Sequence, residues 1–507
     1  MTASKLPQAL YTAAQVRELD VAAIEIGGVP GIQLMKRAGR VSFEVLTSTW
    51  PQCARVIVCC GSGNNAGDGY VVAALAAQRH FAVEVLAVTP PEKLVGDAAK
   101  AYQYALQEGV MVTLVGDAVE FQCSDDTVIV DALLGTGLHG VVRDKFAMVI
   151  QAINNSGLPV LAVDVPSGIC SDTGRVLGCA VKAESTVSFI GLKQGLLSGR
   201  APAFSGTVIF DDLQTSHIRD SDYLDAVERI KPQVIRIALS DYRRYLAERE
   251  ADAHKGQFGH VLVIGGDTGY GGAAAMAAEM ATRSGAGLTS VATRPEHMSA
   301  ILARLPEVMV SGVPSGQALE PLLARPTILV VGPGLGTSPW SEQMLQQANK
   351  SGLPMIVDAD ALNLLAQGRV IPKPQRDNWI LTPHPGEAAR LLGITRDEIQ
   401  ADRFAAAKAL QNKYGGVVVL KGAGTLIANG SEILLADVGN PGMASGGMGD
   451  VLSGLLGGLL AQGLGLSEAA GLGVCAHGDA ADLAVEDSGQ RGLLATDLIP
   501  YIRELLN

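Results

Sequence analysis

One stretch of the chain has residue types and spacing that would support phosphate chemistry. Residues 440–450, NPGMASGGMGD, place four glycines and a carboxylate, Asp450, directly before the apolar run VLSGLLGGLL. A glycine loop that enters a helix presents free backbone N–H groups and the positive end of the helix dipole, which predicts an anion site. A carboxylate beside a phosphate would repel it unless it took part in the reaction, for example as the base for an attacking hydroxyl. We therefore interpret Asp450 as a general base; the alternative is an acid that only favours the helix dipole.

A second glycine loop supports this interpretation. Residues 415–430 predict a strand over Val417–Leu420, a loop of sequence KGAGT and a further strand. The two glycine loops would flank one space of about the size of a phosphate group. Both loops are therefore candidates for holding a phosphorylated ligand.

Three predicted strands in the first half of the chain also end in polar residues. RVIVCC is followed by GSGNNAGDG, a glycine loop that opens a helix and contains Asn64, Asn65 and Asp68. The next two strands end with Asp131 in TVIVDALLGTG and with Asp164 in VLAVDVPSG. Ligands of doubly wound sheets bind at the carboxyl ends of strands near the switch in strand order, so we expect these ends to form one site. The alternative is a chance set of aspartates that cap helices.

Composition limits the class of protein. At 507 residues, the length allows about two to four domains. The 60 glycines, with 48% apolar but only 4% aromatic residues, suit layered α/β domains with many tight loops. A net charge of −12 disfavours nucleic acid or an anionic membrane as a partner, so we expect small-molecule ligands that are held locally.

The cysteines and the N-terminal residues bear on the compartment. Seven cysteines, an odd number without a CxxC or zinc spacing, disfavour a disulfide framework and a metal finger. Cys59 and Cys60, at the end of an apolar strand, are predicted to be small buried hydrophobic residues. The sequence begins without a signal-peptide pattern and contains no run of about 18 apolar residues. We therefore expect a soluble, cytoplasmic protein, and we also expect a homo-oligomer.

Strand and glycine signals predict two layered α/β domains. Residues 211–250 are rich in charge, and we place a linker at 216–226, between domains at residues 1–218 and 227–507. The second series begins with HVLVIGG and a helix of small residues, in which Gly272, Ala273 and Ala274 would let a ligand approach closely. Further strands at LTSVATR, TILVVGPGLG, PMIVDADAL, NWILTPHPG and VVVLKGAG predict a mainly parallel sheet.

The second half resembles the ribokinase-like carbohydrate kinase superfamily and, more narrowly, its ADP-dependent NAD(P)H-hydrate dehydratase branch. The similarity rests on KGAGT, NPGMASGGMGD, TPHPGE, GPGLG and DADALNLL and covers most of residues 255–494. It implies a ribokinase-like three-layer α/β fold that binds ADP with a magnesium ion. It also implies nucleotide contacts by Lys421, Gly422, Ala423, Gly424, Thr425, Gly446, Gly447, Met448 and Gly449, and substrate contacts by Ala273, Ala274, Gly334, Gly336, His384 and Asp450. In TPHPGE, Glu387 is expected to be a helix N-terminal acid.

The first half resembles the NAD(P)H-hydrate epimerase domain, through NNAGDGYV, DALLGTG and VDVPSG, over roughly residues 13–210. It implies a Rossmann-like three-layer domain in which the hydrated nucleotide contacts Asn64, Asn65, Ala66, Gly67, Asp68, Gly135, Thr136, Gly137, Leu138, His139, Gly140, Val141 and Asp164. The resemblance also implies a potassium ion held by Asn65, Asp131 and Ser167. Their oxygens are hard ligands, which suit an alkali or alkaline-earth ion without choosing between potassium and magnesium. Asp164 is our first candidate for the epimerase base.

Two details of the first domain carry further expectations. The epimerase family more often has glycine at position 66, so a positive φ there would be strained by Ala66. The spacing of Gly61, Gly63 and Gly67 misses the regular GxGxxG pattern of dinucleotide-binding dehydrogenases. An NAD-dependent dehydrogenase is therefore a weak alternative.

The combined hypothesis is a bifunctional enzyme that repairs hydrated NADH and NADPH. The first domain would interconvert the R and S hydrates, and the second would dehydrate the S form at the expense of ADP. Two alternatives stay open. One is a ribokinase-like small-molecule kinase fused to a nucleotide-binding domain, and the other is a binding protein whose first domain senses a nucleotide without chemistry.

Overall fold

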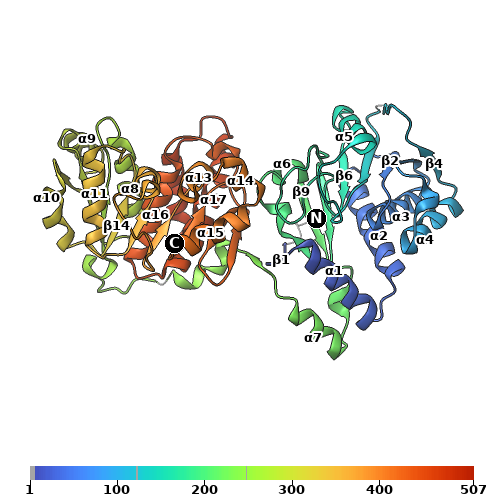
Figure 1. The fold of residues 1–507 in the computed structure, drawn as a ribbon, viewed down its shortest axis with the longest axis horizontal. Coiled ribbons are helices and arrows are strands. Elements are labelled where there is room, and N and C mark those ends of the chain that lie inside the picture. The colour runs from blue at the N-terminus through green and yellow to red at the C-terminus, as the bar shows by residue number, and fades with distance from the viewer. Residues whose placement is uncertain (1–5, 122–123, 247) are drawn as a thin grey trace. The chain divides into compact units, whose positions relative to one another are not determined.

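The computed structural model describes residues 6–121, 124–246 and 248–507. The chain divides into two compact units, one ending at Ile235 and the other beginning at Arg236 (Figure 1). The segment in which we expected a linker contains a helix, α7 (Ser221–Arg229), and the side chain of Tyr223 on this helix is buried in the core of the first unit.

The first unit contains a parallel sheet of seven strands in the order β4-β3-β2-β5-β6-β7-β9. The strand order reverses between β2 and β5, which is the arrangement of a Rossmann-like, doubly wound fold. The prediction of this fold is confirmed, and RVIVCC forms β2 as expected. The strands are β2 (Arg55–Cys60), β3 (Ala82–Ala87), β4 (Met111–Leu114), β5 (Thr127–Ala132), β6 (Val160–Val163), β7 (Ser185–Phe189) and β9 (Thr207–Asp211).

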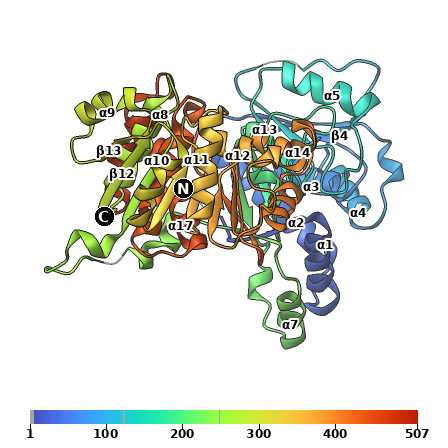
Figure 2. The same ribbon diagram turned by 60° about the vertical axis from the view of Figure 1, so that its left-hand side comes forward.

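Helices cover both faces of this sheet and make the three layers (Figure 2). Side chains alternate along β2: Val56, Val58 and Cys60 pack in the core with α2, α3 and α4, whereas Ile57 and Cys59 pack in the core with α5. The two cysteines are buried, as predicted, and serve as small hydrophobic residues. The helices are α1 (Ala13–Val21), α2 (Gly31–Thr49), α3 (Asn64–Gln78), α4 (Gly96–Gln107), α5 (Asp144–Asn155) and α6 (Pro202–Ser205), with a π-helical turn at Ala22–Ile26. A short strand β1 (Ala9–Tyr11) pairs with β8 (Leu192–Lys193) and β10 (Val234–Arg236).

The second unit contains strands in the order β13-β12-β11-β14-β15-β16-β17-β18-β19. The first seven in this order are parallel, and β18 and β19 are antiparallel, so the prediction of a mainly parallel sheet is confirmed. β13 and β19 were not predicted. The strands are β11 (His260–Ile264), β12 (Leu288–Thr293), β13 (Met309–Gly312), β14 (Ile328–Val331), β15 (Met355–Val357), β16 (Trp379–Leu381), β17 (Val417–Leu420), β18 (Thr425–Ala428) and β19 (Ile433–Ala436).

Close packing of α8 against α16 explains the glycines of VLSGLLGGLL. A Cβ atom on Gly454 would lie 2.1 Å from the Ala277 carbonyl oxygen, and one on Gly458 would lie 1.9 Å from Ser284 Oγ. These glycines therefore fix α16 directly against α8. The helices are α8 (Gly271–Arg283), α9 (Met298–Arg304), α10 (Gly316–Leu319), α11 (Pro339–Lys350), α12 (Ala359–Gln367), α13 (Pro385–Leu392), α14 (Arg396–Ala401), α15 (Arg403–Tyr414), α16 (Met448–Ala461), α17 (Leu466–Ser488) and α18 (Leu498–Leu505).

Two observations concern the chain as a whole. The six cysteines in the described ranges are free thiols. Among the described residues, every helix is too short or too polar to span a bilayer.

Candidate active sites

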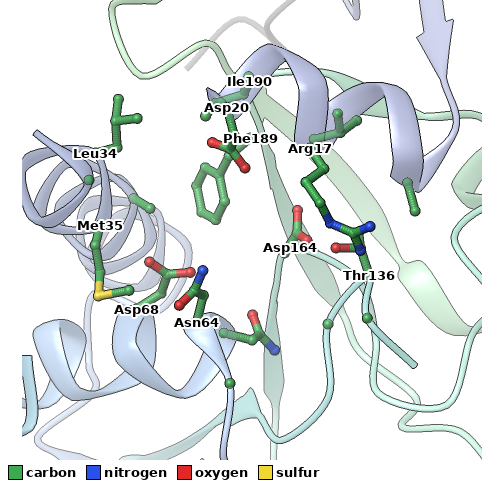
Figure 3. A pocket seen from close by; sticks show the side chains of 18 of the residues that line it. Arg17, Asp20, Leu34, Met35, Asn64, Asp68, Thr136, Asp164, Phe189 and Ile190 are labelled. Carbon is green, nitrogen blue, oxygen red and sulfur yellow. The ribbon is translucent and has the colours of Figure 1, made fainter. Parts of the chain in front are cut away.

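A cavity of about 790 Å³ opens at the carboxyl ends of β2, β5, β6 and β7 in the first unit (Figure 3). It lies at the switch in strand order, where doubly wound sheets bind their ligands. Of the residues predicted to contact the nucleotide, the lining contains Asn64, Asn65, Asp68, Gly135, Thr136, Gly137, Leu138, His139 and Asp164. Ala66, Gly67, Gly140 and Val141 lie outside this lining. Gly67 serves packing, because a Cβ atom there would lie 2.5 Å from Met35 Sδ.

The polar residues after β2 belong to a helix and not to a loop, which corrects our expectation. Helix α3 begins at Asn64, because Gly63 takes an extended conformation and forms the N-cap (φ −105°, ψ −167°). Ala66 lies inside the helix, outside the set of positive-φ residues, so alanine causes no strain at this position. No side chain in the described ranges caps α3, which leaves its first N–H groups available to a ligand.

Asn65, Asp131 and Ser167 converge around the segment that follows β5. Ser167 Oγ donates to Asp131 Oδ1 at 2.6 Å and accepts from the Leu134 N–H at 2.8 Å. Burial raises the pKa of Asp131 to about 6, against the opposing hydrogen bonds from Ser167. Asn65 lies against Gly135, and both polar atoms of its side chain are buried with no hydrogen-bond partner among the described residues. A buried amide without a partner is costly, so this arrangement fits a ligand that the Asn65 oxygen would bind.

Asp164 forms a buried ion pair that the sequence did not predict. It takes a left-handed conformation (φ 66°), which is uncommon for a residue with a side chain and occurs preferentially at functional sites. Its carboxylate pairs with the ammonium of Lys193, which also donates to the Phe189 carbonyl at 2.9 Å. The Lys193 side chain is only 2% exposed. A lysine within β8, directly after the mainly apolar residues 187–192, was the signal that could have revealed this partner.

Helix α1 supplies two charged lining residues that we missed, Arg17 and Asp20. Figure 3 shows Asp20, Asp68 and Asp164 around the same cavity. Burial raises the pKa of Asp20 to about 6, with Lys193 opposing and Asp164 reinforcing the shift. Burial and then the charges of Asp164 and Asp20 raise the pKa of Asp68 well above its usual range. Carboxyl groups with raised pKa values in one cavity are suited to proton transfer near neutral pH.

In the second unit, the glycine loop leads into α16 as predicted. Asn440 Oδ1 accepts from the Gly442 N–H at 2.9 Å and starts a short 3₁₀ turn, Pro441–Met443. Gly447 forms the N-cap of α16 with a left-handed backbone (φ 91°), which glycine adopts without strain. Asp450 therefore lies in the first turn of this helix. The free N–H groups of the first turn and the Asp450 carboxylate therefore lie at the same end of α16, as the sequence predicted.

The KGAGT loop lies beside this helix start. A Cβ atom on Gly449 would lie 3.1 Å from Lys421 Nζ, so the two glycine loops do meet. The buried side chain of Arg403 donates to the carbonyl oxygens of Leu420 and Gly424, at 3.3 and 3.2 Å. These hydrogen bonds fix the KGAGT loop from the protein interior. The sequence did not reveal this role of Arg403.

The electrostatics around Asp450 suit a general base. Burial, and then the nearby Asp358 carboxylate, raise its pKa to about 7, while the charge of Lys421 opposes this shift. A base whose pKa lies near the working pH is the most effective one for proton abstraction. Lys421 Nζ donates to Asp358 Oδ1 at 2.8 Å.

His384 caps a helix. It is the N-cap of α13, and its Nδ1 accepts from the Gly386 N–H at 2.9 Å and from the Glu387 N–H at 3.3 Å. Burial, and then the charge of Lys421, lower the pKa of His384 to about 4, so the ring is neutral at pH 7. The Glu387 carboxylate accepts from the His384 N–H at 2.8 Å, so its expected role at a helix N-terminus is confirmed. The His384 side chain is still 50% exposed, which leaves its outer edge accessible.

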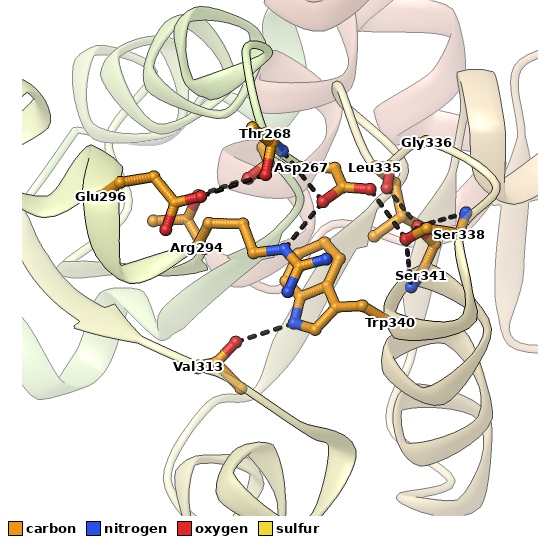
Figure 4. Close-up of polar contacts among 12 residues, drawn as sticks. Asp267, Thr268, Arg294, Glu296, Val313, Leu335, Gly336, Ser338, Trp340 and Ser341 are labelled. Carbon is orange, nitrogen blue, oxygen red and sulfur yellow. Dashed lines mark hydrogen bonds and ion pairs between the residues drawn. The ribbon is translucent and has the colours of Figure 1, made fainter.

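Gly334 and Gly336 belong to the loop that follows β14, and a Cβ atom on Gly334 would lie 2.6 Å from the Tyr270 carbonyl oxygen, directly before α8. Figure 4 shows Gly336 close to Asp267. The Asp267 N–H donates to the Gly334 carbonyl at 2.7 Å, and a Cβ atom on Gly336 would lie 2.9 Å from Asp267 Oδ2. Asp267 accepts from Arg294 Nε at 2.7 Å, and the Arg294 guanidinium lies over the Trp340 ring. This network positions the loop at the carboxyl ends of β11 and β14.

The start of α8 places the two predicted alanines differently. Ala273 is partly exposed near this loop, because a Cβ atom on Gly334 would lie 3.1 Å from it. Ala274 is buried in the helix packing.

The first unit is doubly wound and has a polar cavity at its switch point. The second unit joins a glycine loop at the start of a helix to a carboxyl group whose pKa is raised to about 7. These are features of a two-domain α/β enzyme that acts on nucleotides. A family model described as NAD(P)H-hydrate dehydratase matches residues 261–504, and one described as YjeF-related protein N-terminus matches residues 31–195. The chain belongs to the family of bifunctional NAD(P)H-hydrate repair enzymes, and the resemblance seen in the sequence is confirmed.

Several known proteins are similar to this chain. The bifunctional NAD(P)H-hydrate repair enzyme of Coxiella burnetii is 47% identical, over 98% of this chain and 99% of that protein. The corresponding enzyme of Vibrio cholerae is 43% identical over the full length of both chains. An ADP/ATP-dependent NAD(P)H-hydrate dehydratase from Bacillus subtilis, co-crystallised with ATP and Mg²⁺, is 29% identical, with a TM-score of 0.47 over 53% of this chain and 96% of that structure.

Proposed function

We propose that this chain repairs hydrated NADH and NADPH in two steps. The first domain, residues 1–218, interconverts the R and S hydrates, and the second, residues 227–507, dehydrates the S form with ADP, releasing AMP and phosphate. The observation that carries the proposal is Asp450, a base with a pKa of about 7 in the first turn of α16, directly behind one glycine loop and beside the other. Membership of the repair-enzyme family supplies the substrate class.

For dehydration, Asp450 would accept the proton of the ring hydroxyl while that oxygen attacks the terminal phosphorus of ADP. The bond between phosphorus and the leaving AMP oxygen breaks, and the hydroxyl becomes a phosphate ester. Loss of a proton from C5 and of phosphate from C6 then restores the ring double bond. In this scheme the hydrate is held by Ala273, Gly334, Gly336 and His384, whereas Ala274 is buried in the packing of α8. The nucleotide is held by Lys421, Gly422, Ala423, Gly424, Thr425, Gly446, Gly447, Met448 and Gly449.

Magnesium would arrive with ADP and neutralise its phosphates. Mg²⁺ keeps several waters and takes phosphate oxygens as ligands, so it needs few protein groups. The described residues contain no group of three or more His, Cys, Asp or Glu that could hold a metal ion. The residues present therefore fit a magnesium ion that is held mainly by the phosphates of the nucleotide and by water.

For epimerisation, the bond between C6 and its hydroxyl oxygen would break with help from the electron pair of the ring nitrogen. Water then adds to the opposite face. An acid must protonate the departing hydroxyl, and a base must accept a proton from the entering water. We assign this proton transfer to Asp164, whose carboxylate is held by Lys193 in the cavity. The hydrate would bind along the lining residues Asn64, Asn65 and Asp68 and the segment Gly135–His139.

We propose that Asn65, Asp131 and Ser167 are ligands of a potassium ion. The unpartnered Asn65 amide, the buried Asp131 carboxylate and the Ser167 hydroxyl offer hard oxygen atoms of the type that such a cation takes. The ion would fix the position of the segment after β5 relative to the start of α3, at the edge of the cavity. These residues act as structural ligands and take no part in proton transfer.

Potassium is expected to stabilise the folded chain, and its replacement by a bulky organic cation is expected to slow epimerisation. A ligand that binds only the folded state adds about 2.7 kcal/mol at a hundred times its dissociation constant. Thermal melting at increasing KCl, at constant ionic strength, measures the effect. Asn65→Leu should abolish the dependence, and dehydration of pure S hydrate should not change. Melting of the native chain that ignores potassium would contradict the assignment.

The pH profile of dehydration follows from Asp450. Asp450 acts as a base only when its carboxyl group is ionised. Because its pKa is raised to about 7, the group becomes protonated as the pH falls below about 7. We expect kcat/KM for the S hydrate to fall about tenfold per pH unit below about pH 7 and to level off above it. Steady-state rates with saturating ADP test this expectation. A profile that stays flat from about pH 5.5 to 8 would show that another group is the base.

The overall function is tested by the recovery of reduced-nicotinamide absorbance from a mixture of R and S hydrates, with ADP or ATP supplied separately. Complete recovery with one nucleotide would establish both activities and name the phosphate donor. Recovery that stops when S is consumed would remove the epimerase assignment. A lasting phosphorylated alcohol in place of recovery would favour the small-molecule kinase alternative.

The compartment and the assembly of the enzyme are separate proposals. We propose that it works in the cytoplasm, as a homo-oligomer, with NAD(P)H hydrate and ADP as its partners and with neither nucleic acid nor a membrane. Gel filtration with light scattering tests the oligomeric state.

A further inference from the structure

Asp358 stands at the N-cap of α12 but does not cap it. An aspartate at this position ordinarily accepts from the N–H groups of the first helical turn, which contributes about 0.5–2 kcal/mol. The Asp358 carboxylate accepts no such bond from the described residues. Its side chain is nevertheless 1% exposed. Because the buried Asp358 carboxylate does not cap the helix, other groups must stabilise its charge.

Those partners come from two elements of the dehydration site. Lys421 Nζ, after β17, donates to Asp358 Oδ1 at 2.8 Å. Ser453 Oγ, on α16, donates to Asp358 Oδ2 at 2.7 Å. Ser453 lies three residues after Asp450, hence on the same face of α16. One carboxylate therefore connects the KGAGT loop with the helix that carries the proposed base.

The backbone fixes Asp358 in this place. Its successor Ala359 has a left-handed backbone (φ 48°), a strained conformation for alanine. A Cβ atom on Gly332 would lie 1.8 Å from the Asp358 carbonyl oxygen, so the main chain of β14 approaches it as closely as glycine permits. A Cβ atom on Gly449 would lie 3.4 Å from Asp358 Oδ2 and 3.1 Å from Lys421 Nζ. The pair thus lies directly against the glycine loop.

We propose that Asp358 is a positioning residue of the dehydration site, which holds the Lys421 ammonium beside the glycine loop and prevents it from pairing with Asp450. This inference rests on the proposed function of the second domain. Glu387 and Asp450 are the other carboxylates whose charges act on Lys421, and an ion pair between Lys421 and Asp450 would weaken the proposed proton acceptor. The ion pair with Asp358 keeps the Lys421 ammonium from pairing with Asp450.

The charges that face these groups fix the sign of the effect. Asp450 faces Asp358 and Asp360, which raise its pKa, and Lys421, which lowers it. Lys421 in turn faces Asp358, Glu387 and Asp450, all of which favour its charged form against burial. On the other sides, His384 and His477 are neutral, because burial lowers the pKa of each to about 4. Loss of the Asp358 charge removes repulsion from Asp450 and frees Lys421 to pair with it, so both effects lower the pKa of Asp450.

The test is Asp358→Asn in the full chain, assayed with pure S hydrate and saturating ADP. The plateau of kcat is expected to fall at least tenfold, because a weaker base accepts the proton less well. The acid limb of the profile is expected to move down by at least one pH unit. A merely structural role would lower the rate without moving the limb. An unmoved limb, or one that moves up, would overturn the inference.

Ser453→Ala is the matched control, because it removes the second hydrogen bond of Asp358 without changing a charge. Its acid limb should stay in place. Asp358→Asn could fail to fold, since it leaves a buried ammonium without its counter-ion. The double variant Asp358→Asn with Lys421→Met removes both charges and keeps the inference testable.

In a double-mutant cycle, Asp358→Asn should lower kcat by a smaller factor when Lys421 is already Met than in the unmodified chain, because one of its two effects on Asp450 acts through Lys421. Additive losses would overturn the inference. Failure of the proposed function is recognised separately: the unmodified chain would then show no dehydration of the S hydrate with either nucleotide.

Discussion

Asp450→Asn is expected to lower the rate of dehydration by about 10²- to 10⁴-fold, the range that loss of a general base typically costs. Asparagine keeps the size of the side chain but does not accept the hydroxyl proton at neutral pH. The effect should appear in kcat and kcat/KM together, because the base acts in the transition state and not in binding. Single-turnover absorbance recovery with pure S hydrate and excess ADP measures it.

The bifunctional chain provides its own control for this variant. Epimerisation of the R hydrate, followed by chromatographic separation of the two forms, should proceed at the unmodified rate. Folding should also be intact: burial raises the pKa of Asp450 to about 7, so its charge opposes folding as pH rises from the unfolded value toward 7 and above. Asparagine removes that charge, and the melting temperature at pH 8 should therefore be equal or higher. Near-normal dehydration by the folded variant would remove Asp450 from the mechanism.

The sequence predicted the parts of the fold that depend on local pattern. Buried parallel strands form apolar runs bounded by glycine, and β2 and β17 accordingly have the predicted bounds. A local contact also begins α1, since the Thr12 hydroxyl accepts from the Gln15 N–H at 3.3 Å. Such features need only neighbouring residues.

The parts that failed depend on contacts between distant residues. Asp358 and Lys421 are 63 residues apart, and Asp164 and Lys193 are 29 apart, so neither ion pair leaves a periodic trace in the sequence. Asp20 reaches the first cavity only because α1 packs over it, outside the strand ends on which the prediction was based. In the first unit the recognisable motif contributes Asp164, the candidate base, whereas the lysine that pairs with it lies 29 residues further along the chain.

Asp164→Asn is expected to lower epimerisation by about 10²- to 10⁴-fold, for the same reason that applies to other positioned acids and bases. Asp164 lies in the cavity wall with a strained backbone, and its carboxylate is directed by Lys193. Asparagine can occupy the same place but does not exchange a proton with the departing hydroxyl or the entering water. The measurement is the rate at which pure R hydrate becomes S, in the absence of nucleotide.

The buried partner complicates this variant and also supplies the means to control it. Asp164→Asn leaves the Lys193 ammonium without its counter-ion at a site where the lysine is 2% exposed, and breaking a buried pair costs about 3–5 kcal/mol. Adding Lys193→Met removes both charges and should restore melting without restoring epimerisation. Asp117→Asn, on an exposed residue outside the cavity, should change neither property. Normal epimerisation by the stable double variant would show that the proton passes through another carboxyl of the cavity, with Asp68 and Asp20 next to be replaced, because both line the same cavity and both have raised pKa values.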